Sequence, residues 1–426
     1  MKAMIKLEPS IYLGRVYTPL LHGGWIDIPD GALVVGQDGL IEAVGEKSYI
    51  QSNYAQYKVV DYSSYFIIPG LIDCHQHLCH YEWVKLIPNL LEWLKAIYRI
   101  EIKFKDVDYA QKISNLFFNE LIKNGTTTCC VHGPYYFEAT DIAFEEAKRV
   151  GIRLIMGMNA GDKNLPTELS FRAGESINRS NELFDKWDNA SDGLLHYCFT
   201  VRPGYCSTEE LLSSTAIEAN KRAARIQSHL AEDEEGLNIL LSDFNNDESD
   251  TQLYHRLNLL GSKTIMAHGI YLNDNDIDIL SQTETAIVHC PRANLLAGGR
   301  QMDYSELIKN NIRVGLGSDL GAMKDLSMFR VMEDALKVNH VLSIHELFKF
   351  ATIDGADSLS LKEHTGSLEI GKDADFIIID IKALPREFFN NKSDIEDVLY
   401  SVVFKGHESI ISSVFVKGIQ LKTLSS

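Results

Sequence analysis

The feature that most constrains the fold is a series of short apolar runs of the β type that spans the middle of the chain. Helical patterns separate most of these runs, for example in the stretches 142–149, 208–225 and 275–281. The eight runs are Phe66–Ile72, Thr126–Val131, Arg153–Met158, Tyr197–Val201, Ile226–Leu230, Thr264–Ala267, Ala286–His289 and Arg313–Leu316. Eight strands that alternate with helices predict an α/β fold of the (β/α)₈ barrel type.

An open, doubly wound sheet is the alternative that such an alternation permits. Its dinucleotide-binding members carry a Gly-rich phosphate loop after the first strand, and this sequence has none in that place. The barrel is therefore favoured, and an oxidoreductase with a phosphate-linked cofactor is a distant alternative.

Both ends of the 426-residue chain read as short strands. Near the N-terminus, Ala32–Val35 and Leu40–Val44 flank a hairpin signal, and Phe376–Asp380 is strand-like near the C-terminus. A chain of this length suits a large barrel with a smaller appendage. We expect one β-rich domain from both ends and a barrel inserted between them, with the ranges 1–65 and 366–426 for the first and 66–365 for the second.

Charge and cysteine content narrow the classes of function. A net charge of −18 without a basic patch argues against nucleic-acid binding. The sequence lacks both an N-terminal signal run and 18 uninterrupted apolar residues, so we expect no membrane span. The seven cysteines are odd in number and form no CxxC pair, which predicts reduced, buried thiols in a cytoplasmic protein.

Polar side chains at the ends of the expected strands form a pattern typical of a metal site. In barrels of this type the chemistry collects at the C-terminal strand ends. His75 and His77 follow the first strand at positions i and i+2, so both side chains point to one face, and later strands end in His229, His268 and Asp319. A single histidine at a strand end is more often structural, but the joint pattern favours a metal ion, Zn²⁺ or Fe²⁺.

Glu232 lies three residues after His229 and is the candidate proton carrier. A carboxylate beside a metal-activated water can take a proton and pass it on. The alternative is that Glu232 merely opens the acidic run Glu232–Glu235, which a helix N-terminus would favour. We assign the catalytic role to Glu232 and the helix-terminus role to the three residues that follow it.

The strand Tyr197–Val201 ends in Arg202 and contains no lysine. A carboxylated lysine there would bridge two metal ions, so its absence favours one metal ion per chain. The Arg202 guanidinium offers several donors to a carbonyl or ring nitrogen. From the residues alone, a substrate contact and a structural ion pair are equally supported for Arg202.

The motifs taken together resemble those of the amidohydrolase superfamily over nearly the whole chain. The matching segments are 69–77, 229–232, 267–269, 289–294, 315–319, 351–356 and 366–375. This resemblance implies a distorted (β/α)₈ barrel with a flanking β-sandwich built from both termini.

Within the superfamily the chain is most similar to guanine deaminases, through the segments 91–94, 125–128, 200–202, 227–232, 266–272 and 326–329. The resemblance implies that His75, His77, His229 and Asp319 bind one zinc ion. It implies that Glu232 shuttles protons with the help of His268 and Asp319, and that Arg202, His80 and Trp93 contact the substrate. A cytoplasmic homodimer that converts guanine to xanthine and ammonia is the expected protein.

One position departs from the guanine deaminase pattern. His80 stands roughly where a glutamine is expected, and an imidazole does not reproduce the paired donor and acceptor of an amide. Another purine, a pterin or a triazine is therefore an alternative substrate. Ring opening of a cyclic amide on the same site, and a non-enzymatic scaffold, are the alternative functions, the last disfavoured because all four expected metal ligands are present.

Overall fold

The computed structural model describes residues 6–82, 90–244, 246–297, 300–321, 325–384, 394–406 and 408–422. The chain divides into two compact units, the first formed by 1–72, 120–128 and 327–426 and the second by 73–119 and 129–326. The domain limits expected from the sequence, at 65/66 and 365/366, stay a prediction. No helix of the described residues is long and apolar enough to cross a membrane.

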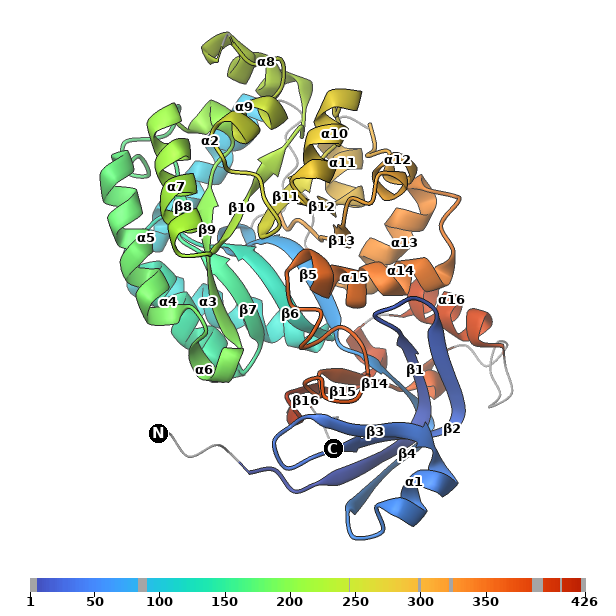
Figure 1. Ribbon diagram of the computed structural model, residues 1–426. Coiled ribbons are helices and arrows are strands. Elements are labelled where there is room, and N and C mark those ends of the chain that lie inside the picture. Colours follow the sequence, from blue (N-terminus) through green and yellow to red (C-terminus); the bar gives the residue numbers. More distant parts are fainter. Residues whose placement is uncertain are drawn as a thin grey trace. The chain divides into compact units, whose positions relative to one another are not determined.

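A seven-stranded sheet in the first unit brings the two ends of the chain together, as the blue and red strands of Figure 1 show. In spatial order its strands are β16 (Ile419–Lys422), β15 (Ile411–Val416), β14 (Phe376–Ile379), β4 (Lys58–Pro69), β1 (Ser10–Pro19), β2 (Trp25–Val35) and β3 (Ile41–Glu46). Alternate residues of β1 enter two different apolar clusters, Tyr12 and Val16 in one and Ile11 and Leu13 in the other. The predicted β-structure from both termini is confirmed, including the hairpin of β2 and β3.

The second sheet is the predicted eight-stranded parallel barrel, nearly closed. Its strands are β5 (Leu71–His77), β6 (Thr126–His132), β7 (Arg153–Gly157), β9 (Leu195–Val201), β10 (Arg225–Leu230), β11 (Thr264–His268), β12 (Ala286–His289) and β13 (Val314–Leu316), and the short β8 (Asn159–Ala160) pairs with β9. Beyond β13, the Asp319 N–H donates to the His75 carbonyl at 3.1 Å, which links the last strand end to the first strand.

Helices follow the barrel strands, and α4, α5 and α7 lie outside their strands in Figure 1. The helices up to β13 are α2 (Leu90–Glu101), α3 (Val107–Lys123), α4 (Phe137–Val150), α5 (Ala173–Trp187), α6 (Ala190–Gly193), α7 (Glu209–Lys221), α8 (Glu234–Asp243), α9 (Asp250–Arg256), α10 (Asp274–Gln282), α11 (Pro291–Ala297) and α12 (Tyr304–Lys309). The remaining helices are α1 (Lys47–Asn53), α13 (Met328–Val338), α14 (Ile344–Phe350), α15 (Ile353–Ser358) and α16 (Ile395–Lys405).

The first barrel strand begins later than the sequence suggests. Phe66–Pro69 belongs to β4 and pairs antiparallel with β14, so the predicted strand Phe66–Ile72 is wrong in its limits. Gly70 separates the two strands, and β5 continues to His77. His75 and His77 therefore lie within β5, where the two-residue spacing still places both side chains on one face.

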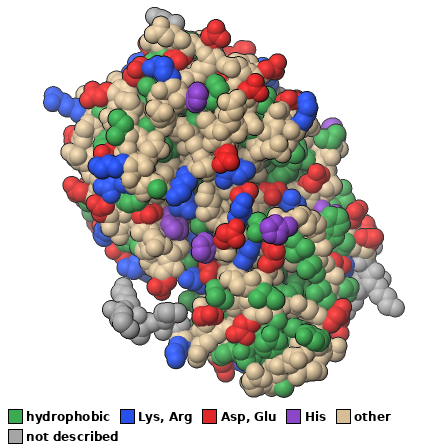
Figure 2. All heavy atoms as spheres, viewed as in Figure 1, with side chains coloured by type: hydrophobic (Ala, Val, Ile, Leu, Met, Phe, Trp, Pro, Cys, Tyr) green, Lys and Arg blue, Asp and Glu red, His purple; other side chains and the backbone are tan. Residues whose placement is uncertain are grey.

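All seven cysteines are buried and none forms a disulfide, as the sequence predicts. On the face drawn in Figure 2, acidic and basic side chains are interspersed.

Gly157 provides a test of the barrel packing. A Cβ at Gly157 would overlap the Cys198 carbonyl on the neighbouring strand, whereas a Cβ at Gly174 in α5 would meet nothing within 4 Å. We expect Gly157→Ala to cost at least about 1–3 kcal/mol of stability, as overpacking does, and Gly174→Ala to be neutral or stabilising by about 0.5–1 kcal/mol. Denaturant unfolding of both variants measures this, and equal stabilities would contradict the strand packing described.

Candidate active site

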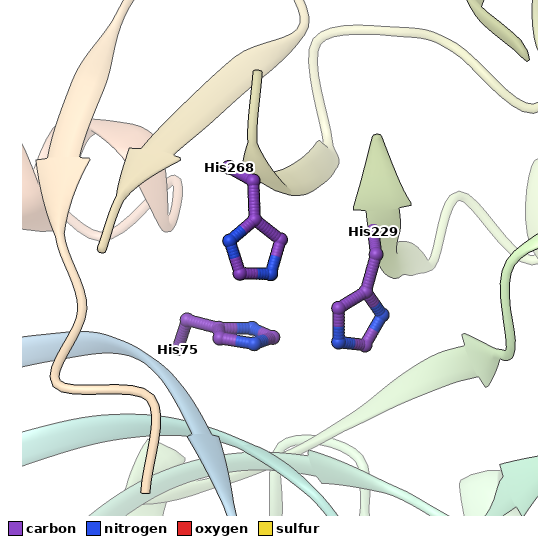
Figure 3. Close-up of side chains that lie close together, drawn as sticks. All are labelled: His75, His229 and His268. Atoms are coloured by element: carbon purple, nitrogen blue, oxygen red, sulfur yellow. The ribbon is translucent and has the colours of Figure 1, made fainter. Parts of the chain in front are cut away.

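Buried histidines from three barrel strands meet at the carboxyl ends of the strands. His75 comes from β5, His229 from β10 and His268 from β11, and Figure 3 shows their rings turned toward a common space. The ring centroids of His75 and His229 are 4.9 Å apart, and those of His229 and His268 are 5.4 Å apart. His77, also from β5, lies 5.1 Å from His229 by the same measure.

The potential ligand atoms lie close enough to bind one ion. His77 Nε2 and His229 Nε2 are 3.1 Å apart, and Asp319 Oδ1 lies 3.5 Å from His75 Nε2 and 3.7 Å from His77 Nε2. His75 Nε2 is buried and has no hydrogen-bond partner among the described residues. Three imidazole nitrogens and one carboxylate oxygen are a donor set that suits a divalent transition metal, so the residues present fit such an ion.

The protonation of these side chains also fits metal binding. Burial lowers the pKa of His75, and lowers the pKa of His77 and His229 well below the ordinary histidine value. Burial would raise the pKa of Asp319, but the nearby imidazoles of His75 and His268 outweigh it and lower this pKa. Neutral imidazoles and an ionised carboxylate are the forms that bind metal ions.

A buried polar network fixes the loop that carries Asp319. Asp73 accepts hydrogen bonds from the Ser318 hydroxyl at 2.6 Å and from the Gln76 amide at 2.5 Å. The Gln76 Oε1 atom in turn accepts from the Leu320 N–H at 3.2 Å. The network matters because Asp319 has a φ of 50°, a left-handed conformation that costs energy for a residue with a Cβ.

Glu232 stands beside His268 at the edge of the histidine group. Its Oε1 atom is 3.6 Å from His268 Nε2, and its side chain is 16% exposed. Burial raises the pKa of Glu232 to about 7, against the lowering effect of His268. For His268, burial lowers the pKa, but Glu232 and Asp319 outweigh it, and the pKa is raised. Glu232 can therefore hold or release a proton near neutral pH.

Two residues outside the predicted set position this pair. The Asn294 Oδ1 atom lies 3.0 Å from His268 Nδ1 and accepts a hydrogen bond from the N–H group there, which leaves Nε2 directed at Glu232. Asp250 Oδ2 accepts from the Ala231 N–H at 2.6 Å, and Ala231 has a left-handed φ of 47° directly before Glu232. No local sequence pattern predicts either contact, because each joins segments far apart along the chain.

A cavity of about 290 Å³, a volume that includes space open to solvent, lies beside the ligand atoms. Seven of the nine predicted site residues line the cavity, and His75 and His268 do not. The seven are His77, His80, Trp93, Arg202, His229, Glu232 and Asp319, and Leu94, Pro203 and Tyr205 complete the wall. Trp93 Nε1 and Arg202 Nε are buried N–H donors without a hydrogen-bond partner among the described residues. A ligand with acceptor atoms is suited to such a wall.

His80 lies on this wall, but the protein holds both of its ring nitrogens. Nδ1 is 3.2 Å from the Leu320 carbonyl, and Nε2 is 3.3 Å from Glu101 Oε1. The ring stacks on His77 with centroids 4.5 Å apart. A substrate contact through a nitrogen of His80 would have to compete with these partners, and that role stays a prediction.

His132, at the end of β6, is a residue that the sequence reasoning missed. It is 1% exposed, and its ring centroid lies 5.1, 4.7 and 4.8 Å from those of His75, His77 and His229. The available signal was a histidine directly after the predicted strand Thr126–Val131, the same signal that identified the other strand-end histidines.

A (β/α)₈ barrel with this set of donor atoms at its strand ends belongs to the class of barrels with a metal site. Comparison with known proteins identifies the family. The sequence profile of the Amidohydrolase family matches residues 66–420, and the chain belongs to this family. The guanine deaminase of Escherichia coli (strain K12) is 30% identical, over 92% of this chain and 91% of that protein. The guanine deaminase of Dictyostelium discoideum is 28% identical, over 97% of this chain and 98% of that protein.

A solved structure supports the same relationship. The guanine deaminase from C. acetobutylicum, described with guanine bound in its active site, superposes with a TM-score of 0.90 at 27% identity. The match covers 97% of this chain and 99% of that chain. The whole fold, and not only the barrel, is therefore shared with that protein.

Proposed function

We propose that this chain is a hydrolytic deaminase that converts guanine and water to xanthine and ammonia. The observation that carries the proposal is the close grouping of the ligand atoms of His75, His77, His229 and Asp319 beside a small cavity that Glu232 also lines. His268 lies 3.6 Å from Glu232 at the edge of this group. The similarity to guanine deaminases over more than nine-tenths of the chain supports guanine as the substrate.

We further propose that the metal is one zinc ion per chain, held by His75, His77, His229 and Asp319. When bound, such an ion lowers the pKa of a water molecule and polarises the group that is attacked. The three imidazoles, neutral because they are buried, and the ionised Asp319 supply the matching donors.

In the proposed reaction Glu232 carries the protons. It takes a proton from the attacking water and delivers it to the ring nitrogen beside the carbon that bears the amine. A C–O bond forms at that carbon. Glu232 then passes the remaining proton of the added hydroxyl group to the amine, the C–N bond breaks, and ammonia leaves. His268, fixed through Nδ1 by Asn294, orients the reacting groups, and the donors of Arg202 and Trp93 hold the ring.

A substrate screen tests the proposal directly. Zinc-loaded protein is mixed with guanine, and ammonia release is followed together with the absorbance change from guanine to xanthine. Ammonia release from another purine, a pterin or a triazine, with none from guanine, would show that the protein is a deaminase with a different substrate. Turnover of a cyclic amide without ammonia would contradict the deaminase proposal.

Asn294 should affect the rate through His268. We expect Asn294→Leu to lower kcat by about 10–100-fold, the range for residues that orient groups at metal sites, because the tautomer of His268 is no longer fixed. Asn294→Asp keeps an acceptor for Nδ1–H and should recover much of the loss. Steady-state kinetics with zinc analysis measures both variants, and equal losses in the two would argue against the tautomer role.

A homodimer, a cytoplasmic location and a place in purine catabolism complete the proposal. The dimer and the place in purine catabolism rest on the resemblance to guanine deaminases alone, and the location also rests on the seven cysteines, which are buried and form no disulfide. Mass measurement of the native protein in solution tests the dimer, and a monomer at micromolar concentration would contradict it.

A further inference from the structure

A second cavity shares part of its lining with the substrate pocket. It has a volume of about 240 Å³, which includes space open to solvent. Four residues line both spaces, namely Pro203, Tyr205, His229 and Glu232. The residues found only in the second cavity are Leu230, Ala231, Asp233, Gly236, Leu237, Leu240 and Asp250. Glu232, the proposed proton carrier, therefore borders both the space for the ring and this additional space.

The second cavity is acidic and poor in donors. Asp250 is 5% exposed; its Oδ2 atom binds the Ala231 N–H, but its Oδ1 atom is buried and makes no hydrogen bond to the described residues. Asp233 uses Oδ1 to cap α8 at the Gly236 N–H, and its Oδ2 atom is buried and likewise without a partner. A buried carboxylate oxygen without a donor is costly, so these two atoms favour a bound group that brings N–H donors.

The electrostatics of the cavity point to a cation. Burial raises the pKa of Asp250 to about 7 although the backbone N–H groups of Ala231 and Thr251 lower it, and burial also raises the pKa of Asp233. A positive charge in the cavity would stabilise the ionised carboxylates. The groups of described side chains that could hold a metal ion include neither aspartate, and three leucines line the remaining wall, so a divalent metal is a poor fit.

We propose that this cavity receives the ammonium ion formed from the released amine. The inference rests on the proposed deaminase function. Hydrolysis turns a ring C–NH₂ and water into a ring C=O and NH₃, and ammonia takes up one proton at neutral pH to become NH₄⁺. Ammonium brings four N–H donors, one positive charge and no acceptor, which matches Asp233, Asp250 and Glu232. Because Glu232 lines both cavities, the proposed proton carrier borders the space for the ring and the space for the ammonium ion.

The first test detects the site without any turnover. Crystals of the zinc-loaded wild-type protein are soaked in rubidium chloride, since Rb⁺ is close to ammonium in size and gives anomalous scattering. We expect a peak between Asp233 and Asp250 in the wild type and none in Asp250→Asn, which keeps an oxygen for the Ala231 N–H. Only water at this position in the wild type would overturn the proposal.

The second test uses ammonium as an inhibitor of the reaction. Ammonium chloride should inhibit wild-type turnover, whereas tetramethylammonium chloride at the same ionic strength, being too large and without N–H donors, should not. In Asp250→Asn the inhibition constant should rise by about tenfold or more, as expected for loss of a charged hydrogen-bond partner. Asp243→Asn is the matched control, because Asp243 ends α8 but does not line the cavity and pairs with Lys163.

The outcomes separate this inference from the proposed function. Ammonium inhibition that is equal in the wild type and in the Asp250→Asn and Asp233→Asn variants would overturn the ammonium site while leaving the deaminase intact. If no heterocycle releases ammonia, the deaminase proposal fails on its own. Rubidium soaking still reports whether the cavity binds a monovalent cation.

Discussion

Replacing Glu232 with glutamine is expected to lower guanine turnover by at least about a hundredfold, the low end for general acid–base catalysis. An amide of the same shape cannot take and return a proton, although it fills the same space beside His268. Zinc content should stay at the wild-type level, because Glu232 is not among the four proposed ligands. The measurements are steady-state kinetics and metal analysis of the purified variant.

Glu234→Gln is the matched control for this experiment. Glu234 lies two residues further along the same acidic run, is exposed in the first turn of α8, and does not line either cavity. The activity of the Glu234→Gln variant should equal that of the wild type. Near-normal turnover in Glu232→Gln, or an equal loss in the Glu234 variant, would remove the proton-carrier assignment.

Replacing His229 with alanine is expected to remove both the metal and the activity. His229 Nε2 lies 3.1 Å from His77 Nε2, so the two rings share the position of the proposed ion, and the loss of one leaves three donors. Turnover should fall by at least about 10⁴-fold, beyond the effect of one general acid–base group, because the activated water is lost with the ion. Metal analysis and kinetics of the variant measure both effects.

His255→Ala is the matched control, because it removes a histidine that is not a proposed ligand. His255 is exposed on α9, away from the ligand atoms, and its variant should keep wild-type zinc and turnover. A His229→Ala protein that retains one zinc per chain and full activity would show that His229 is not a ligand. A His229→Ala protein that keeps its zinc but has no activity would show that His229 acts in the reaction and is not needed to bind the metal.

The barrel could be predicted from the sequence because the patterns that indicate strands and helices are local. Seven of the eight predicted runs fall on barrel strands or their borders, and the first, Phe66–Ile72, only reaches the start of one. Apolar β-type runs between helical patterns are typical of parallel strands that are buried on both faces. The positions of His229, His268 and Asp319 relative to those runs then predicted that the side chains would meet, and in the structure they do. This step needed only the rule that parallel strands end at the same side of a barrel.

Where two adjacent strands belong to different sheets, the sequence was insufficient. Phe66 and Leu71 lie in one apolar run, yet Phe66 pairs with Ile379 in the seven-stranded sheet and Leu71 begins the barrel. Hydrophobicity does not distinguish these partners, because both environments are buried. The pairing comes from residues more than 300 positions away along the chain.

The tertiary structure alone decided what surrounds the predicted site residues. His80 has its nitrogens held by Leu320 and Glu101, Asn294 fixes His268, and Asp250 holds the backbone before Glu232. Each contact joins segments that no local pattern connects, and a hydrogen bond depends on distances of a few tenths of an ångström. The chemical groups of the site could thus be predicted from the sequence, because strand periodicity places them. Their hydrogen-bond partners and the two cavities form only when the strands have closed into a barrel.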